Sequence, residues 1–238
     1  MISQLSDLIW PPRSLLSETI VDRPGVIEPQ LWGELRFLSQ PLCACCGFPL
    51  PDHAAEGDRC AACAADAPAY DSACAALAYD DHARKLILDL KRGGRRDGLP
   101  VFARWMAAAG AERLERADFL APAPMHWTRL AVRSFNQAAW LTQALARASG
   151  KPWKPATLVR VKRRRSQAGL SASERRRNVG GAIKASGRFK GKTVIVVDDV
   201  FTTGATLEAC ARALRKAGAA EVHAVTLARV VRPADILI

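Results

Sequence analysis

Two adjacent carboxylates, Asp198 and Asp199, follow a run of β-branched residues and precede a short loop rich in threonine. The run at 193–197 is typical of a strand buried on both faces of a parallel sheet, and we expect it to end at the acid pair. Apolar residues at helical spacing then predict a helix at 205–217. Backbone N–H groups at the start of a helix bind phosphate, and two carboxylates can accept hydrogen bonds from a vicinal diol. The segment therefore predicts a site for a sugar phosphate.

The loop itself reads Thr-Thr-Gly-Ala-Thr from Thr202 to Thr206. Gly204 permits close approach of a phosphate, and the threonine hydroxyls add hydrogen bonds. No Gly-Lys-Ser/Thr follows, so this is not a Walker loop. An ordinary strand with a capped helix explains one acid and one threonine but not the whole set. No basic residue lies near the acid pair in the sequence, so we expect the two charges to repel until a ligand or Mg²⁺ relieves them.

Two C-x-x-C pairs separated by thirteen residues lie in the N-terminal third of the chain. This spacing allows a short hairpin to place four thiolates around one tetrahedral Zn²⁺. A register with Cys45 in place of Cys46 is the alternative, but Gly47 directly after Cys46 suits the tight turn of the knuckle. We expect structural zinc on Cys43, Cys46, Cys60 and Cys63.

The positive charge of the chain is concentrated in one segment. Residues 160–192 hold twelve Lys or Arg against one acid, Glu174, and so supply +11 of the net charge of +12. This pattern indicates an anionic partner, either a polyphosphate ligand or a nucleic-acid backbone, with a merely solvated basic face as the alternative. The sequence shows no basic leader with a long apolar segment, so we expect a cytoplasmic protein without membrane insertion.

The chain divides into three parts by composition. We expect an irregular or helical segment at 1–40, a zinc ribbon-like module at 41–68 (the zinc module) and an α/β domain at 69–238. Within this last part, patterns predict helices at 81–91 and 135–148, and strands at 119–124, 157–161 and 222–227. Strand, loop, helix and strand in succession form a βαβ unit, so the sheet should be mainly parallel.

The order of hydrophobic strand, two acids, two residues and Thr-Thr-Gly-x-Thr resembles the phosphoribosyl pyrophosphate (PRPP) signature of type I phosphoribosyltransferases. In that family the acid pair holds the ribose 2′ and 3′ hydroxyls and the loop holds the 5′-phosphate. Members that salvage hypoxanthine or guanine have an aspartate at the place of Thr202, so the resemblance disfavours those acceptors here. It implies PRPP binding by Asp198, Asp199, Val200, Thr202, Thr203, Gly204, Ala205 and Thr206.

Over 31–229 the chain is similar to the ComF family of competence-associated proteins. The matching pieces are the zinc knuckles, a helix ending in Lys91, and the segments 121–138, 163–183 and 194–214. The resemblance implies a type I phosphoribosyltransferase fold with a small N-terminal four-cysteine zinc module. Ser134 departs from the pattern, because it stands where the family usually has glycine.

The resemblance also implies a function linked to DNA uptake. As an enzyme, the protein would transfer a phosphoribosyl group from PRPP, bound with Mg²⁺, to an unidentified acceptor and release pyrophosphate. No catalytic residue is assigned. The alternative is a non-catalytic PRPP sensor that binds single-stranded DNA or regulates the uptake machinery, with DNA-uptake proteins or another copy of the chain as further partners. Basic residues expected at the pyrophosphate are Arg133, Arg175, Arg176 and Arg177.

Overall fold

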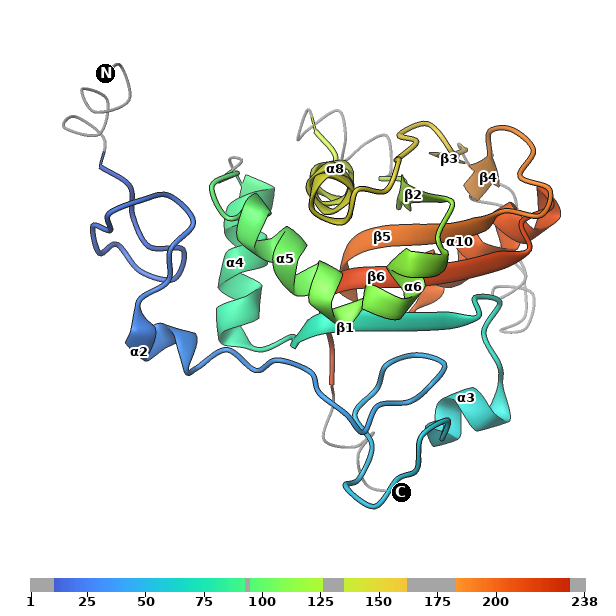
Figure 1. Ribbon diagram of the computed structural model, residues 1–238, viewed down its shortest axis with the longest axis horizontal. Helices are drawn as coiled ribbons and strands as arrows, with labels where there is room; N and C mark the ends of the chain where they lie inside the picture. The colour runs from blue at the N-terminus through green and yellow to red at the C-terminus, as the bar shows by residue number, and fades with distance from the viewer. Residues whose placement is uncertain (1–10, 93–94, 126–134, 162–182, 232–238) are drawn as a thin grey trace, which may run out of the picture.

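The computed structural model of the protein describes residues 11–92, 95–125, 135–161 and 183–231. Its centre is a four-stranded parallel sheet of order β1-β6-β5-β2. These strands are β1 (Ser72–Ala78), β2 (Phe119–Pro122), β5 (Thr193–Phe201) and β6 (Glu221–Arg229) (Figure 1). Because all four are parallel, their carboxyl ends meet at one edge, where ligands of open α/β sheets bind.

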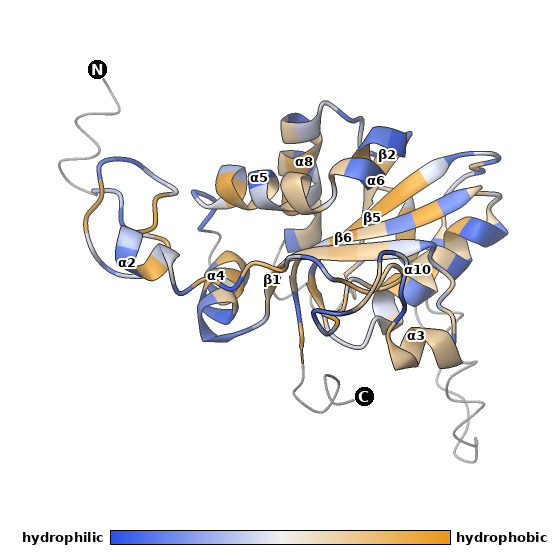
Figure 2. Ribbon diagram, turned by 60° about the horizontal axis from the view of Figure 1, so that its bottom comes forward, coloured by the Kyte–Doolittle hydropathy of each residue, from blue (hydrophilic) through white to orange (hydrophobic). Residues whose placement is uncertain are grey.

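Helices cover both faces of the sheet (Figure 2). One face packs against α5 (Leu99–Ala109), α6 (Ala111–Arg116) and α8 (Gln137–Ser149), and the other against α10 (Ala205–Lys216). The β5 residues from Val194 to Val197 are almost completely buried between these layers. This double burial explains the continuous β-branched run in the sequence.

The predicted elements around the site are confirmed with small shifts of their ends. The helix expected at 81–91 is α4 (Asp81–Arg92), and the strand expected at 222–227 is β6. The strand expected at 157–161 is β3 (Leu158–Arg160), which pairs antiparallel with β4 (Ile183–Ala185) in a separate small sheet. The pattern analysis did not predict β1, α5 or β4.

The N-terminal third packs along the edge of the main sheet. It contains the short helices α2 (Pro29–Trp32) and α3 (Ala61–Ala65). The Leu38 N–H donates to the Ala76 carbonyl at 3.0 Å, so the segment around Leu38 covers the open edge of β1. The Ala73 N–H donates to the Cys45 carbonyl at 2.8 Å, which joins the cysteine-containing segment expected to form the zinc module to the same strand. Across the described ranges, no helix combines the length and apolarity needed to span a membrane.

Candidate functional site

The loop after β5 presents backbone donors at the carboxyl edge of the sheet. Gly204 precedes α10 in the left-handed conformation, with a φ of 77°. A Cβ here would lie 2.8 Å from the Phe201 ring, so both the backbone angle and the space require glycine. Thr202 and Thr203 are exposed, and Thr203 Oγ1 makes only a long contact of 3.5 Å with the Ala205 N–H. The first turn of α10 therefore offers N–H groups to an anion.

Asp198 and Asp199 lie within β5. The expectation that the strand ends at 197 is wrong, because backbone pairing with β6 continues to Phe201. Successive side chains of a strand point to opposite faces, so the two carboxylates leave the strand in different directions. Asp198 Oδ1 accepts a hydrogen bond from the Asp199 backbone N–H at 2.9 Å. The two acids therefore have different surroundings although they are adjacent in sequence.

Asp199 has two side-chain partners from distant helices. Its Oδ2 accepts a hydrogen bond from Gln137 Nε2 at 2.9 Å and lies 2.8 Å from the Lys91 Nζ. The side chains of Lys91 and Asp199 are 21% and 9% exposed, so water screens this ion pair weakly. The expectation that no basic residue neutralises the acid pair is therefore wrong for Asp199. Motif analysis gave Lys91 and Gln137 no function, although both lie in segments that match the ComF pattern.

Asn136 fixes the start of α8 and so positions Gln137. Its Oδ1 accepts the Ala138 N–H at 3.0 Å, and its Nδ2 donates to the Ala123 carbonyl beyond β2 at 3.0 Å. Gln137 is buried, and its Oε1 has no hydrogen-bond partner among the residues that the structure describes. Because buried polar atoms are normally paired, this oxygen is an available acceptor beside the acid pair.

Burial, and then the charge of Asp199, raises the pKa of Asp198 to about 7. The positive charge of Lys91 opposes this shift only in part. Near neutral pH, the protonated and ionised forms of Asp198 are therefore both populated. A ligand hydroxyl or a Mg²⁺ ion bound beside Asp198 would stabilise its carboxylate and so shift its protonation equilibrium toward the ionised form.

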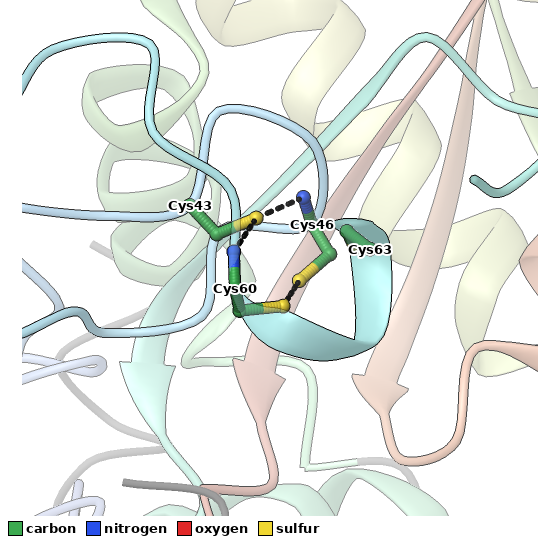
Figure 3. A group of neighbouring side chains, drawn as sticks. All are labelled: Cys43, Cys46, Cys60 and Cys63. Atoms are coloured by element: carbon green, nitrogen blue, oxygen red, sulfur yellow. Dashed lines mark hydrogen bonds between the residues drawn. The ribbon is translucent and has the colours of Figure 1, made fainter. Parts of the chain in front are cut away.

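Four cysteine side chains come together where the two C-x-x-C pairs meet (Figure 3). The sulfurs of Cys43, Cys46, Cys60 and Cys63 all lie within 4.8 Å of one another, and those of Cys46 and Cys60 are 3.7 Å apart. A tetrahedral zinc with Zn–S distances of about 2.3 Å separates its sulfurs by about 3.8 Å, so the donor set fits this ion. Cys45 is buried but is not part of the group.

Hydrogen bonds hold the four-cysteine group in place. Cys43 Sγ accepts the backbone N–H of Cys60 at 3.2 Å and that of Cys46 at 3.5 Å. A hydrogen bond with the Cys46 thiol lowers the pKa of Cys43 to about 4, and the same bond raises the pKa of Cys46. Cysteine binds metal as the thiolate, so the lowered pKa of Cys43 favours metal binding by this group. Zinc itself stays a prediction.

The residues expected at the pyrophosphate lie outside the part of the chain that the structure describes. These are Arg133, Arg175, Arg176 and Arg177. Their assignment stays a prediction.

Comparisons with known proteins agree with this architecture. Residues 136–235 match the model of the phosphoribosyl transferase domain. Competence protein F of Haemophilus influenzae is 32% identical over 199 residues, which cover 80% of this chain and 86% of that protein. The chain belongs to the ComF family. A further relative, the DNA utilization protein YhgH of Salmonella typhimurium, is 31% identical over 193 residues, covering 79% of this chain and 84% of that protein.

Solved structures of phosphoribosyltransferase-type proteins overlap with about half of this ComF protein. The glutamine PRPP amidotransferase from B. subtilis is 26% identical with a TM-score of 0.35, covering 54% of this chain and 27% of that chain. The fold expectation is confirmed by the family model and the parallel sheet: this is a type I phosphoribosyltransferase fold with a four-cysteine module near its N-terminus.

Proposed function

We propose that this ComF protein binds PRPP at the carboxyl edge of its sheet and transfers the phosphoribosyl group to an acceptor. The carrying observation is that an acid pair, with Asp199 buried and Asp198 partly exposed, and a left-handed glycine loop at a helix start follow each other at the end of β5. The loop N–H groups would hold the 5′-phosphate, and Asp198 and Asp199 the ribose hydroxyls. Carboxylate oxygens are also suitable ligands for the Mg²⁺ that accompanies PRPP.

The residues around the acid pair would orient it for this role. Lys91 and Gln137 fix the Asp199 carboxylate, so it would accept a ribose hydroxyl with little reorganisation. In the reaction, the bond from ribose C1 to the pyrophosphate oxygen breaks and the acceptor forms a new bond to C1. Positive charge develops on the sugar, and nearby carboxylates stabilise it. The released pyrophosphate would bind Arg133 and the arginines 175–177.

A structural zinc ion on the four cysteines would hold the zinc module against β1. Since the relatives are named for competence and DNA utilization, we further propose that the protein acts in the cytoplasm on the handling of incoming DNA. Direct binding to the incoming DNA and a metabolic reaction that supports DNA uptake are both consistent with those names.

Exposed aromatic residues favour a second candidate function, binding of single-stranded DNA without turnover. Trp32 and Phe37 are 45% and 41% exposed, and their ring centroids lie 5.6 Å apart, with Arg36 next to Phe37 in the chain. Bases stack on such rings, and the net charge of +12 favours a phosphate backbone.

One experiment separates these functions. Calorimetry with Mg²⁺ and PRPP measures binding, and release of pyrophosphate with a panel of bases and amine donors measures turnover. The proposal expects binding by the parent and a loss of affinity of roughly two to four orders of magnitude when both acids become asparagine. PRPP binding without release by any acceptor would favour the sensor, and unchanged PRPP binding by the double variant would refute the ribose assignment.

A further inference from the structure

A second pocket lies between the zinc module and the start of α10. Its volume is about 580 Å³, within the range of small-molecule sites. One wall comes from the zinc module and α3, and the other from the loop residues 201–205 and the first turns of α10. Asp198 and Asp199 are not among its lining residues. The pocket therefore shares the loop residues 202–205 with the proposed PRPP site but does not contain the ribose acids.

Arg229, the last residue of β6, lines this pocket as a buried cation. Its residue surface is only 8% exposed, and within the described ranges no carboxylate forms an ion pair with it. Its Nη1 donates to the Cys46 carbonyl at 2.8 Å, while its buried Nε has no partner in the described part of the chain. A buried charge is costly unless it is paired, so this guanidinium points to a missing anion. Its planar set of donors matches a carboxylate.

Aromatic rings surround the guanidinium. The Phe201 and Phe48 ring centroids lie 4.1 Å and 5.3 Å from the Arg229 Cζ, and Tyr70 packs edge-on against Phe201. All three rings line the pocket, together with several alanines. This lining suits the aromatic body of a ligand, since rings stack or pack edge-on against one another and small-molecule sites are lined mainly by apolar side chains.

Of the two acidic residues in the pocket lining, Asp66 and Glu208, the second is already paired. Glu208 accepts the Ala69 N–H at 2.8 Å and forms an ion pair with Arg212 at 2.5 Å. It therefore does not neutralise Arg229. The start of α10, which also lines the pocket, adds partial positive charge.

We propose that this pocket binds a small planar organic anion, an aromatic carboxylate whose carboxylate meets Arg229 and whose ring lies among the three aromatic side chains. The proposal does not depend on PRPP binding or on turnover. The rival explanation for the buried guanidinium is that it only balances the charge of the zinc thiolates, through its contact with Cys46.

The test uses 2-naphthoate and its neutral amide, 2-naphthamide, titrated by calorimetry into the zinc-loaded full chain. The acid should bind at least tenfold more tightly than the amide. Arg229→Met should abolish this preference without weakening amide binding. Arg212→Met, a matched arginine at the same pocket, should leave the preference within twofold. The variant with both Asp198 and Asp199 changed to asparagine should bind naphthoate like the parent.

Several results would overturn the proposal. Equal binding of acid and amide by the parent, or no binding of either, rejects the carboxylate site and leaves Arg229 as a partner of the thiolates. Displacement of naphthoate by an equal concentration of inorganic phosphate shows that the pocket is a phosphate site. Zinc content and melting temperature are measured for each variant. If Arg229→Met loses zinc, the comparison of acid and amide in the parent decides the question.

Discussion

Replacing Asp198 by asparagine should stabilise the protein above neutral pH, whereas replacing Asp199 should destabilise it. Burial, and then the charge of Asp199, raises the pKa of Asp198 from 3.8 to about 7. The stability associated with protonated Asp198 is complete below pH about 4 and is lost as the pH rises through about 7. Asparagine does not titrate, so the variant avoids this loss. Asp199, in contrast, is the partner of Lys91.

The size of each effect follows from the surroundings. The difference between 3.8 and about 7 corresponds to about 4 kcal/mol. Asp198 is partly exposed and solvent screens it, so we expect about 1–3 kcal/mol at pH 8. For a chain of this size this is a rise in Tm of about 2–12 °C. Asp199→Asn leaves Lys91, 21% exposed, without its partner and should cost about 2–3 kcal/mol, less than a fully buried pair.

Urea unfolding of the zinc-loaded protein at pH 5, 6, 7 and 8 measures both effects. The advantage of Asp198→Asn over the parent should be small at pH 5 and grow toward pH 8. Asp118→Asn is the control, because a hydrogen bond from Lys192 lowers the pKa of Asp118. Removing this carboxylate should therefore not increase the stability at any of the four pH values. The reasoning is refuted if Asp198→Asn is no more stable than the parent at pH 8, or if its advantage is the same at pH 5.

Four further predictions concern the metal and the ligand. Cys46→Ser should lose the zinc that Cys45→Ser keeps, and metal analysis showing less than half an equivalent in the parent purified without chelator would contradict the zinc assignment. Gly204→Ala should lower the Tm and remove the rise that PRPP causes in the parent, since its Cβ strains the loop; an unchanged rise would argue against a phosphate there. Binding of Mg²⁺ and PRPP at pH 7 should release about half a proton from the parent and none from Asp198→Asn, measured by calorimetry in buffers of different ionisation heat. Protease cleavage within 162–178 should slow at saturating PRPP, and an unchanged rate would contradict a pyrophosphate role for this segment.

The features that the sequence predicts well are local ones. The strand, loop and helix of the phosphate site are contiguous, so the β-branched run, the loop residues and the helical spacing all act within one segment. The four cysteines come from two close pairs with the spacing of metal ligands. Asp199 and Lys91 meet only after α4 and β5 have packed, and no local pattern encodes that contact.

The edge strand β1 shows a second kind of limit. Its sequence, SACAALA, has no β-branched residue and reads as helix by propensity. It forms a strand because β6 pairs with it on one side and the segment around Leu38 on the other, with α5 packed on its face. Small side chains allow that close packing, so tertiary context decides the structure.

The two acids of the site, adjacent in sequence, are prepared for different tasks. Asp199 is held by Lys91 and Gln137, so its carboxylate keeps its orientation whether or not a ligand is present. Asp198 accepts only a backbone N–H among the described residues, and burial raises its pKa to about 7, so its charge depends on what binds beside it. A cation or a hydroxyl donor that binds beside Asp198 stabilises its carboxylate, which burial otherwise destabilises. This stabilisation increases the affinity for the ligand. Asp198→Asn should therefore give a protein that is more stable but binds PRPP more weakly. At this position, the carboxylate that favours ligand binding lowers the stability of the fold.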